Sequence, residues 1–383
     1  MIIPIIIVSY LALIVFGITD NIRGPLFSLI LKEFTVSDSI GSYFFSLSSI
    51  SSFLMGLFSL YFFKRYKKKN LFLISGFGLL ATLIFFSYAS NFFMIMVGSL
   101  MFGLFAGLLG LLPNVLVPSA TTIGKRQQVL AGLHSMYGIS SLFAPIFVAM
   151  LVNYFHSWRD VFKYSSIFAI ILIVYLFFID ASLFEQKFEE HSVEGSHLQN
   201  GQHPYLKNFI FAPILSFAVM TEVMISSRLS LFLFREGHFS FSDASIGLTY
   251  FFIALLSGRL LFTFIKFPFS LIQQVTFLEI LTILFILSGI YLHPYFLIVA
   301  GFSIAPVYPL IAAIIAQEFK GHLDRAMTIC VSSNSLLLAF MHVFVGKITD
   351  LFGLKQAMLF GVLFLVASMF LLNFNALFLK KSN

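Results

Sequence analysis

Apolar segments long enough to cross a membrane recur along the whole chain, and they constrain its fold more than any other feature. A helix needs about 20 apolar residues to span a hydrocarbon core of roughly 30 Å, and it satisfies its backbone hydrogen bonds internally, as lipid requires. Twelve such segments are predicted, at residues 3–30, 39–63, 70–89, 91–117, 128–154, 161–183, 209–234, 244–265, 271–292, 295–316, 327–350 and 357–379. Only 10% of the residues are charged, whereas soluble domains carry about 25%. The sequence therefore predicts an all-α integral membrane protein.

Charged residues recur at matching places in the two halves of the chain. Arg23 lies 15 residues before Asp38 of a VSDSIG stretch, and Arg228 lies 15 residues before Asp243 of an FSDASIG stretch. Duplicated units of this kind are typical of transporters that bind their substrates between the repeats, near the bilayer midplane. We expect two six-helix bundles related by a pseudo-two-fold axis along the membrane normal.

The longest polar stretch, residues 185–208, divides the chain almost in half. It is rich in Glu, Gln, His and Ser, and its histidines recur every six residues, a spacing that places them on no common face of a helix or turn. No cysteine joins them, so a solvated linker is favoured over a metal site. We predict an N-terminal bundle at 1–184, a cytoplasmic linker at 185–208 and a C-terminal bundle at 209–383, with no metal and no cofactor.

Basic residues outside the apolar segments are distributed unequally between the two sides of the membrane. If the N-terminus is cytoplasmic, that side carries Lys64, Arg65, Lys67, Lys68, Lys69, Lys125, Arg126, Lys187, Lys207, Lys266, Lys320, Arg325, Lys380 and Lys381. The opposite side then carries Lys32, Arg159, Lys163, Arg235, Lys347 and Lys355. Because cytoplasmic loops carry the excess of Lys and Arg, we expect both termini in the cytoplasm and the protein in a bacterial inner membrane. Topology also explains the Lys64–Lys69 run better than a nucleic-acid patch does, so no nucleic-acid partner is expected.

Charged residues within the apolar segments are the strongest candidates for chemistry. An ionised side chain at membrane depth costs several kcal/mol, so it usually faces a cavity, finds a partner and marks a substrate or ion path. Asp20 and Arg23 are three residues apart on one helical face and can pair. Glu222 and Arg228 are six apart, so each needs a partner elsewhere. Glu279, in the ninth segment, has no evident partner, and no role is predicted for it.

The two carboxyls differ in their expected role from the two arginines. A carboxyl in a poorly hydrated cavity can exchange protons near neutral pH, so Glu222 is the first candidate for proton coupling and Asp20 the second. Arg23 and Arg228 either hold these carboxylates ionised or attract an anionic substrate group. The structural alternative for Asp20 and Arg23 is a buried ion pair that locks the first helix against a neighbour.

Further polar residues and prolines on the apolar segments complete the predicted site. Substrate contacts are expected from Asn21, Asn114, His134, Tyr137, Tyr308 and Asn334, together with the four charged residues, although polar side chains also join membrane helices to one another. Proline removes a backbone hydrogen bond, so Pro113, Pro306 and Pro309 are expected to interrupt the fourth and tenth helices, the last two as gating elements. Lys64 and Arg259 are also predicted gating residues, and Arg259 is expected to reach the cytoplasmic face or a loop acid.

Several motifs resemble one family of membrane transporters. They are FGITDNIRGP at Phe16–Pro25, Asn114, HSMYG at His134–Gly138, Glu222, SGR at Ser257–Arg259 and GFSIAPVYP at Gly301–Pro309. In order and spacing, over nearly the whole chain, they resemble the major facilitator superfamily, particularly its fucose-permease-like branch of sugar:proton symporters. The resemblance implies a monomer in the lipid bilayer that works by alternating access, with a small-molecule substrate and protons as the coupling ion.

The chain departs from the superfamily's pattern at three places. The loop at Ser59–Lys67, SLYFFKRYK, lacks both glycines and the acid of the family motif, so no gating salt bridge on that acid is expected. The acidic residue of the sugar:proton branch in the fourth helix is Gly110 here, which excludes proton coupling at that position. Where organophosphate exchangers carry arginines in helices 1 and 7, this chain has Asp20 and Glu222. Sugar transport is therefore an analogy of fold, which does not identify a substrate.

Together these features predict secondary active transport of a small polar organic solute, with proton coupling. The solute is expected to be a sugar, or an anionic metabolite such as a carboxylate-rich siderophore. The sequence contains no Walker-type nucleotide loop and no nucleophile–histidine–acid arrangement, so neither ATP-driven pumping nor enzymatic activity is expected. One alternative is efflux of amphipathic compounds by proton antiport, which a chain with 52 Phe residues would suit. The other is a non-transporting membrane sensor on the same scaffold.

Overall fold

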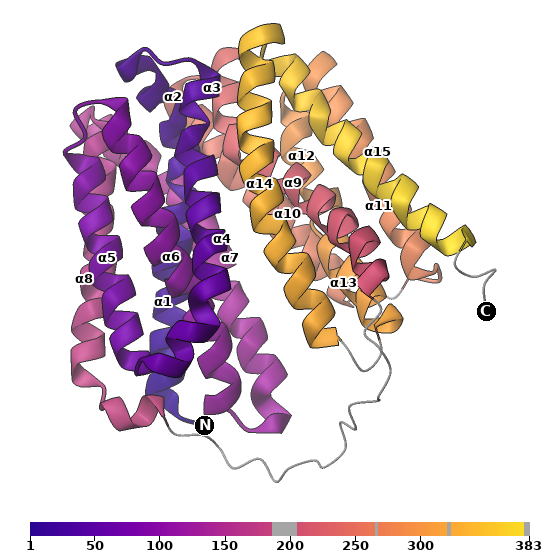
Figure 1. The fold of residues 1–383 in the computed structure, drawn as a ribbon. Helices are drawn as coiled ribbons and strands as arrows, with labels where there is room; N and C mark the ends of the chain where they lie inside the picture. The colour runs from indigo at the N-terminus through magenta and orange to yellow at the C-terminus, as the bar shows by residue number, and fades with distance from the viewer. Residues whose placement is uncertain (186–204, 265–266, 320–322, 379–383) are drawn as a thin grey trace. The chain divides into compact units, whose positions relative to one another are not determined.

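The computed structural model describes residues 1–185, 205–264, 267–319 and 323–378. Most of the predicted linker lies outside these residues, as do Lys187, Lys266, Lys320, Lys380 and Lys381 of the orientation argument. Over the described ranges the secondary structure is helical (Figure 1), and twelve helical segments are long and apolar enough to cross a membrane. The predicted all-α, twelve-helix fold class is confirmed.

Packing divides the chain into two units, Met1–His191 and Ser192–Asn383. The first contains α1 Ile3–Asn21, α2 Arg23–Phe34, α3 Asp38–Gly41, α4 Tyr43–Arg65, α5 Lys68–Ser87, α6 Phe92–Ala120, α7 Ile123–Phe155, α8 Trp158–Phe178 and the 3-10 helix η1 Ala181–Phe184. The second contains α9 Tyr205–Arg235, α10 Phe241–Phe264, α11 Leu271–Tyr291, α12 Tyr295–Ile304, α13 Val307–Glu318, α14 Leu323–Phe352 and α15 Leu354–Phe378.

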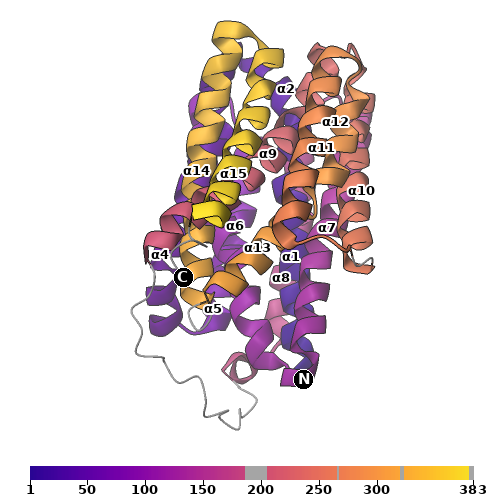
Figure 2. The same cartoon turned by 90° about the vertical axis from the view of Figure 1, so that its right-hand side faces the viewer.

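The same helix pairings occur inside both units. In the first, α1 packs against α7, α4 against α6, and α5 against both α6 and α8. Their counterparts in the second are α9 against α14, α10 against α12, and α11 against both α12 and α15, and Figure 2 shows α10, α11 and α12 side by side. Asp38 and Asp243, which first indicated the repeat, each lie in the first turn of a helix. The duplication read from the sequence thus extends to the internal packing of each unit.

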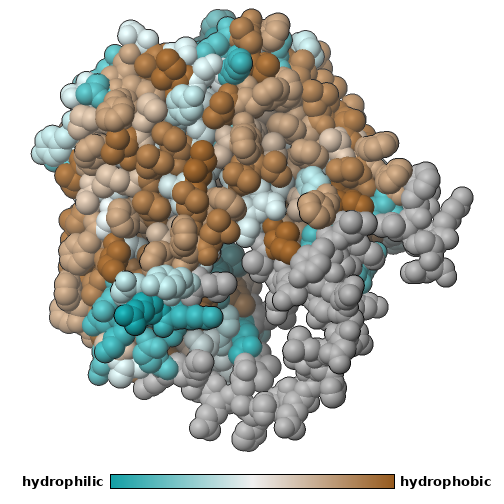
Figure 3. All heavy atoms as spheres, viewed as in Figure 1, coloured by the Kyte–Doolittle hydropathy of each residue, from teal (hydrophilic) through white to brown (hydrophobic). Residues whose placement is uncertain are grey.

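The surface of the helices is apolar along their length. Figure 3 shows hydrophobic side chains covering the helix flanks, while hydrophilic ones gather at helix ends, most densely where α4 turns into α5. This turn carries the exposed side chains of Lys64, Arg65 and Lys67. Apolar flanks with polar ends are what a lipid environment requires.

The first membrane span is broken in its middle, although one continuous helix was expected over residues 3–30. The span covers Ile3–Phe34, but α1 ends at Asn21 and α2 begins at Arg23. Pro25 explains the break, because proline has no N–H to donate to the carbonyl of the residue four positions earlier, here Asn21. The break therefore falls beside the charged residues of the span.

The tenth span is also broken, as its prolines predicted. The first helix, α12, ends at Ile304 and the second, α13, begins at Val307. Pro306 and Pro309 cannot donate to the carbonyls four residues earlier, so the helical ladder is interrupted there. In contrast, α6 continues through Pro113, and the predicted interruption of the fourth span is wrong, because transmembrane helices can absorb a proline by local adjustment.

Close packing of paired helices depends on glycine. A Cβ atom on Gly103 of α6 would meet the backbone carbonyl of Ser48 in α4, and one on Gly258 of α10 would meet the backbone carbonyl of Phe302 in α12. Small residues let membrane helices approach closely. These matching contacts set the distance between equivalent helix pairs in the two units.

Gly103→Val is expected to lower the free energy of unfolding by about 1–3 kcal/mol, the cost of overpacking a close contact. The clash is with main-chain atoms of Ser48, which can move only if α4 moves. Gly56 provides the control, because a Cβ on it meets nothing within 4 Å, and Gly56→Val should lie within about 0.5 kcal/mol of wild type. Unfolding in mixed detergent micelles measures both. Equal losses in the two variants would show that the α4–α6 contact is not tight.

Candidate functional site

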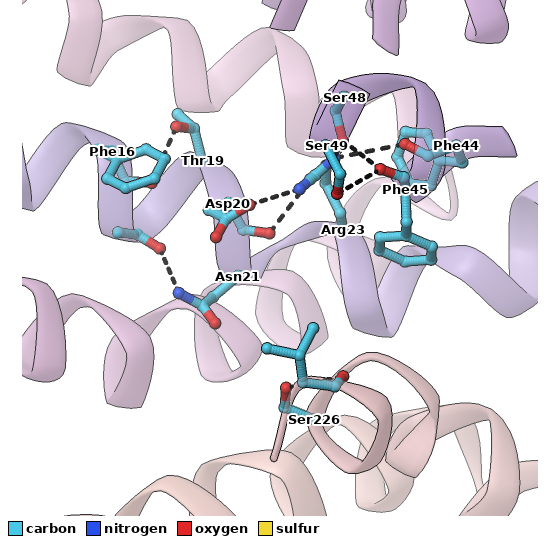
Figure 4. A network of polar contacts seen from close by, with 12 residues as sticks. Phe16, Thr19, Asp20, Asn21, Arg23, Phe44, Phe45, Ser48, Ser49 and Ser226 are labelled. Carbon is cyan, nitrogen blue, oxygen red and sulfur yellow. Dashed lines mark hydrogen bonds and ion pairs between the residues drawn. The ribbon is translucent and has the colours of Figure 1, made fainter. Parts of the chain in front are cut away.

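The first candidate site lies at the break between α1 and α2. The Arg23 Nη2 atom is 2.5 Å from Asp20 Oδ1, which confirms the predicted pairing of residues three apart. The Arg23 Nε atom also donates to the Asp20 backbone carbonyl at 3.4 Å. Figure 4 shows both contacts. The side chain of Arg23 is only 9% exposed and that of Asp20 26%, so most of this ion pair is shielded from solvent.

Arg23 also ties the break to neighbouring helices. Its Nη1 atom donates to Ser48 Oγ at 2.8 Å and to the Phe44 carbonyl at 3.4 Å, both in α4 (Figure 4). The guanidinium carbon lies 4.3 Å from the centroid of the Phe102 ring in α6 and 5.4 Å from that of Phe45. Aromatic faces stabilise a desolvated cation. The guanidinium is thus engaged on its edge and over its face by the protein itself.

The second oxygen of Asp20 is also engaged. The Tyr137 hydroxyl of α7 donates to Asp20 Oδ2 at 2.9 Å. The adjacent residue, Asn21, donates from Nδ2 to Ser141 Oγ of α7 at 3.0 Å and to the Gly17 carbonyl at 2.8 Å. Of the predicted substrate contacts, Asp20, Asn21, Arg23 and Tyr137 therefore come together in one network that joins α1, α4 and α7.

The second candidate site lies in the C-terminal unit, between α9 and α10. The Arg259 Nη2 atom lies 3.1 Å from Glu222 Oε1 and 3.5 Å from Oε2. The expectation that Arg259 pairs with a loop acid is wrong, because its guanidinium pairs with the Glu222 carboxylate, mid-span on α9. Arg228 is 1% exposed, and it is not the residue that pairs with Glu222.

The break in the tenth span positions this second pair. Pro309 cannot donate to the Ala305 carbonyl, and Arg259 Nε donates to that carbonyl instead, at 3.4 Å. Tyr308, on the first turn of α13, lies within electrostatic range of both Arg259 and Glu222. In each unit, therefore, an Asp/Glu–Arg pair sits beside an interrupted helix. Interrupted helices are where transporters of this architecture bind substrates and coupling ions.

The two ion pairs differ in their access to solvent. The difference lies in the arginines, since the side chain of Arg259 is 45% exposed and that of Arg23 is 9% exposed, whereas Glu222 and Asp20 are similar at 21% and 26%. An exposed pair gains little from Coulomb attraction, about 0–1 kcal/mol, so water and protons can compete for the Glu222 carboxylate. The pair at Asp20 has the more deeply buried arginine, and its carboxylate accepts a further hydrogen bond from the Tyr137 hydroxyl. The C-terminal pair is therefore the more readily opened of the two.

The remaining predicted site residues lie on α4, α6, α7 and α14. Asn114 of α6 is exposed, but its amide donates to the Gly110 carbonyl of the same helix at 2.8 Å. His134 is exposed on α7, three residues before Tyr137. Asn334 of α14 is half-buried, and its Oδ1 atom has no hydrogen-bond partner in the described part of the chain. Lys64 is exposed at the end of α4. Within the described residues, no hydrogen bond or ion pair given above joins Asn114, Asn334 or Lys64 to either ion pair.

Comparisons with known proteins agree with this architecture. The model of the Major Facilitator Superfamily matches residues 9–330, and comparison with curated proteins gives no match. Among solved structures, the chain is similar to a D-xylose–proton symporter at 14% identity, covering 97% of each chain with a TM-score of 0.74. It is similar to the nucleoside transporter NupG at 14% identity, covering 98% of this chain and 99% of that one with a TM-score of 0.73. The human organic anion transporter MFSD10 gives 14% identity, 97% and 99% coverage and a TM-score of 0.66.

Structural likeness at these identities shows the fold and leaves the substrate open. The family model, however, spans most of the sequence, including both ion pairs and both interrupted helices. Twelve candidate membrane spans accompany it. The chain therefore belongs to the Major Facilitator Superfamily and is a multi-pass membrane transporter of the secondary type.

Proposed function

We propose that this transporter carries a small neutral polar solute, of the sugar or nucleoside class, by alternating access and in symport with protons. Among the structures that share its fold are a D-xylose–proton symporter and a nucleoside transporter, which supports the proposal by analogy. The bias of basic residues supports both termini in the cytoplasm, and we propose a bacterial inner membrane as the location and a monomer as the working unit.

The pairing of Arg23 and of Arg259 with carboxylates is the observation that supports a neutral solute. Arg23 pairs with Asp20, and Arg259 pairs with Glu222. Each pair is neutral overall, so neither offers an uncompensated cation to a substrate carboxylate or phosphate. A siderophore or anionic metabolite would have to displace a carboxylate from its arginine, whereas a hydroxyl-rich solute can hydrogen-bond to the pair as it stands.

The C-terminal pair has the features that proton coupling needs. Protonation of Glu222 removes the charge that holds Arg259, so the ion pair opens when a proton binds and closes when it leaves. Arg259 also donates to the Ala305 carbonyl at the α12–α13 break. Opening the ion pair would therefore change a contact at an interrupted helix. Interrupted helices give a span a place to bend between the states of a transport cycle.

We assign Asp20 a positioning role in place of the second coupling role that its sequence context suggested. Both of its oxygens accept contacts, from Arg23 and from Tyr137. A proton on Asp20 would neutralise the charge that pairs with Arg23, and the α1–α4–α7 network would lose its central ion pair. The network is therefore better suited to hold the first span in a fixed shape near the solute.

The purified protein in proteoliposomes tests this function. Counterflow should exchange a labelled pentose, hexose or nucleoside, and labelled dicarboxylates should give background counts. A pH gradient, acidic outside, should drive accumulation of the exchanged solute. Counterflow of a dicarboxylate alone would contradict the neutral-solute proposal. Expulsion of an amphipathic dye without any sugar or nucleoside exchange would instead establish efflux, and no flux of any probe would favour the sensor.

A further inference from the structure

A second membrane-embedded carboxyl lies in the C-terminal unit, away from the Glu222–Arg259 pair. Glu279 of α11 is 0% exposed. Neither of its carboxyl oxygens has a hydrogen-bond partner in the described part of the chain. No role was predicted for this residue. Its helix, α11, packs against α12, α13 and α15, which enclose the side chain.

The polar groups around Glu279 are hydroxyls that donate their hydrogen bonds to other acceptors. Thr282, on the same face of α11, donates to the Leu278 carbonyl at 2.8 Å or to Ser303 Oγ of α12 at 2.7 Å. Ser303 in turn donates to a carbonyl of its own helix. Ser368 of α15 lies near the Glu279 carboxyl without hydrogen-bond geometry, and its hydroxyl is directed at a carbonyl of α9.

Among the described residues, no charged side chain interacts with the Glu279 carboxyl. The described titratable side chains on the helices packed against α11 are Tyr295 of α12, Tyr308 and Glu318 of α13, and Lys355 of α15, and α11 itself carries Tyr291. None of these interacts with Glu279, for which Ser368 is the one interacting side chain among the described residues. An ionised carboxylate in such surroundings would cost several kcal/mol, so the group neutralises instead.

A polar contact one helical turn from Glu279 joins α11 to the interrupted tenth span. Thr282, one turn beyond Glu279, bonds to Ser303, which lies one residue before the end of α12. Two residues further, the Ala305 carbonyl accepts from Arg259. Movement of the α12–α13 junction would therefore disturb the contacts of Arg259 at one end and the enclosure of Glu279 at the other.

We propose that Glu279 is a second proton-binding site of this transporter, closed within the C-terminal unit, whose proton exchanges only when the α12–α13 junction moves. The site takes a proton rather than a substrate, because the surrounding helices leave the carboxyl no exposed surface. It rests on the transporter assignment but is independent of the coupling role proposed for Glu222.

Infrared difference spectroscopy of the full chain in lipid vesicles tests the proposal, since a protonated carboxyl has a carbonyl stretch apart from the amide bands. At neutral pH, wild type should show this band, Glu279→Gln should lose it, and Glu279→Asp should shift it. Glu222→Gln should keep it, as should the control Glu236→Gln, which removes a carboxylate paired with Lys355 outside the proposed site. The band should also exchange slowly in deuterated buffer.

Two results would overturn the proposal. If wild type and Glu279→Gln have the same carboxyl bands at neutral pH, Glu279 is ionised and holds no proton. If the band is present in choline chloride but disappears on addition of sodium chloride, the site binds a metal cation instead. Because Glu279→Asp retains a carboxyl, its band tests the assignment even if the glutamine variant fails to fold. Loss of proton coupling in Glu222→Gln leaves these outcomes unaffected, so the two proposals fail separately.

Discussion

Glu222→Gln is expected to abolish proton-driven accumulation of the solute while leaving solute exchange close to the wild-type rate. Glutamine keeps the size of glutamate, and its carbonyl can still accept from Arg259, but it cannot take up and release a proton. The loss should be about 100-fold or more in the pH-driven rate, the scale of effect found when a proton-transfer group is removed. The fold should tolerate the change because the Arg259 side chain is 45% exposed.

Paired assays separate coupling from binding in this variant. Counterflow without a pH gradient measures exchange, and uptake after a pH jump measures coupling, both in the same vesicles. Glu236→Gln is the matched control, since it removes a carboxylate that pairs with Lys355, outside both candidate sites. If Glu222→Gln accumulates solute in response to the pH gradient as wild type does, the coupling proton binds elsewhere.

Arg23→Met is expected to cause the largest loss of stability among single changes in the N-terminal unit. It leaves Asp20 with only the Tyr137 hydroxyl as a donor, and it removes the contacts to Ser48 and the Phe102 ring that join the first span to α4 and α6. Breaking one partner of a buried ion pair costs about 3–5 kcal/mol. Detergent-titrated unfolding followed by circular dichroism measures this loss.

A second variant shows whether the loss comes from the uncompensated charge. Arg23→Met combined with Asp20→Asn removes both charges, so it should recover a large part of the stability that the single change loses, a coupling that a double-mutant cycle quantifies. Lys64→Met, at the exposed end of α4, is the control and should stay within about 0.5 kcal/mol of wild type. An Arg23→Met protein as stable as this control would show that the network does not hold the first span.

The fold followed from the sequence because each membrane span has its own local signature. About 20 apolar residues suffice to specify a spanning helix, and the i,i+3 spacing of Asp20 and Arg23 sufficed to predict their contact. Pro306 likewise indicated the break in the tenth span. The repeat of charged residues indicated the duplication, which the matching helix pairings then showed inside each unit.

The contacts between helices could not be read in the same way. Glu222 and Arg259 are 37 residues apart on different helices, and no spacing rule links such positions. The one available signal was that both are charged residues within apolar segments, which must find partners. The burial of Glu279 was missed because it depends on how α11 packs. The break at Asn21 was missed because Pro25, its cause, lies four residues beyond it.

The central claim is that Glu222 couples solute movement to protons, and solute-driven proton flux tests it most directly. Proteoliposomes with a pH-sensitive dye inside are given an inward gradient of the solute found by counterflow, without any imposed pH gradient. Wild type should acidify the vesicle interior as solute enters, and Glu222→Gln should leave the internal pH unchanged. Solute entry through wild type with no change in internal pH would contradict the claim.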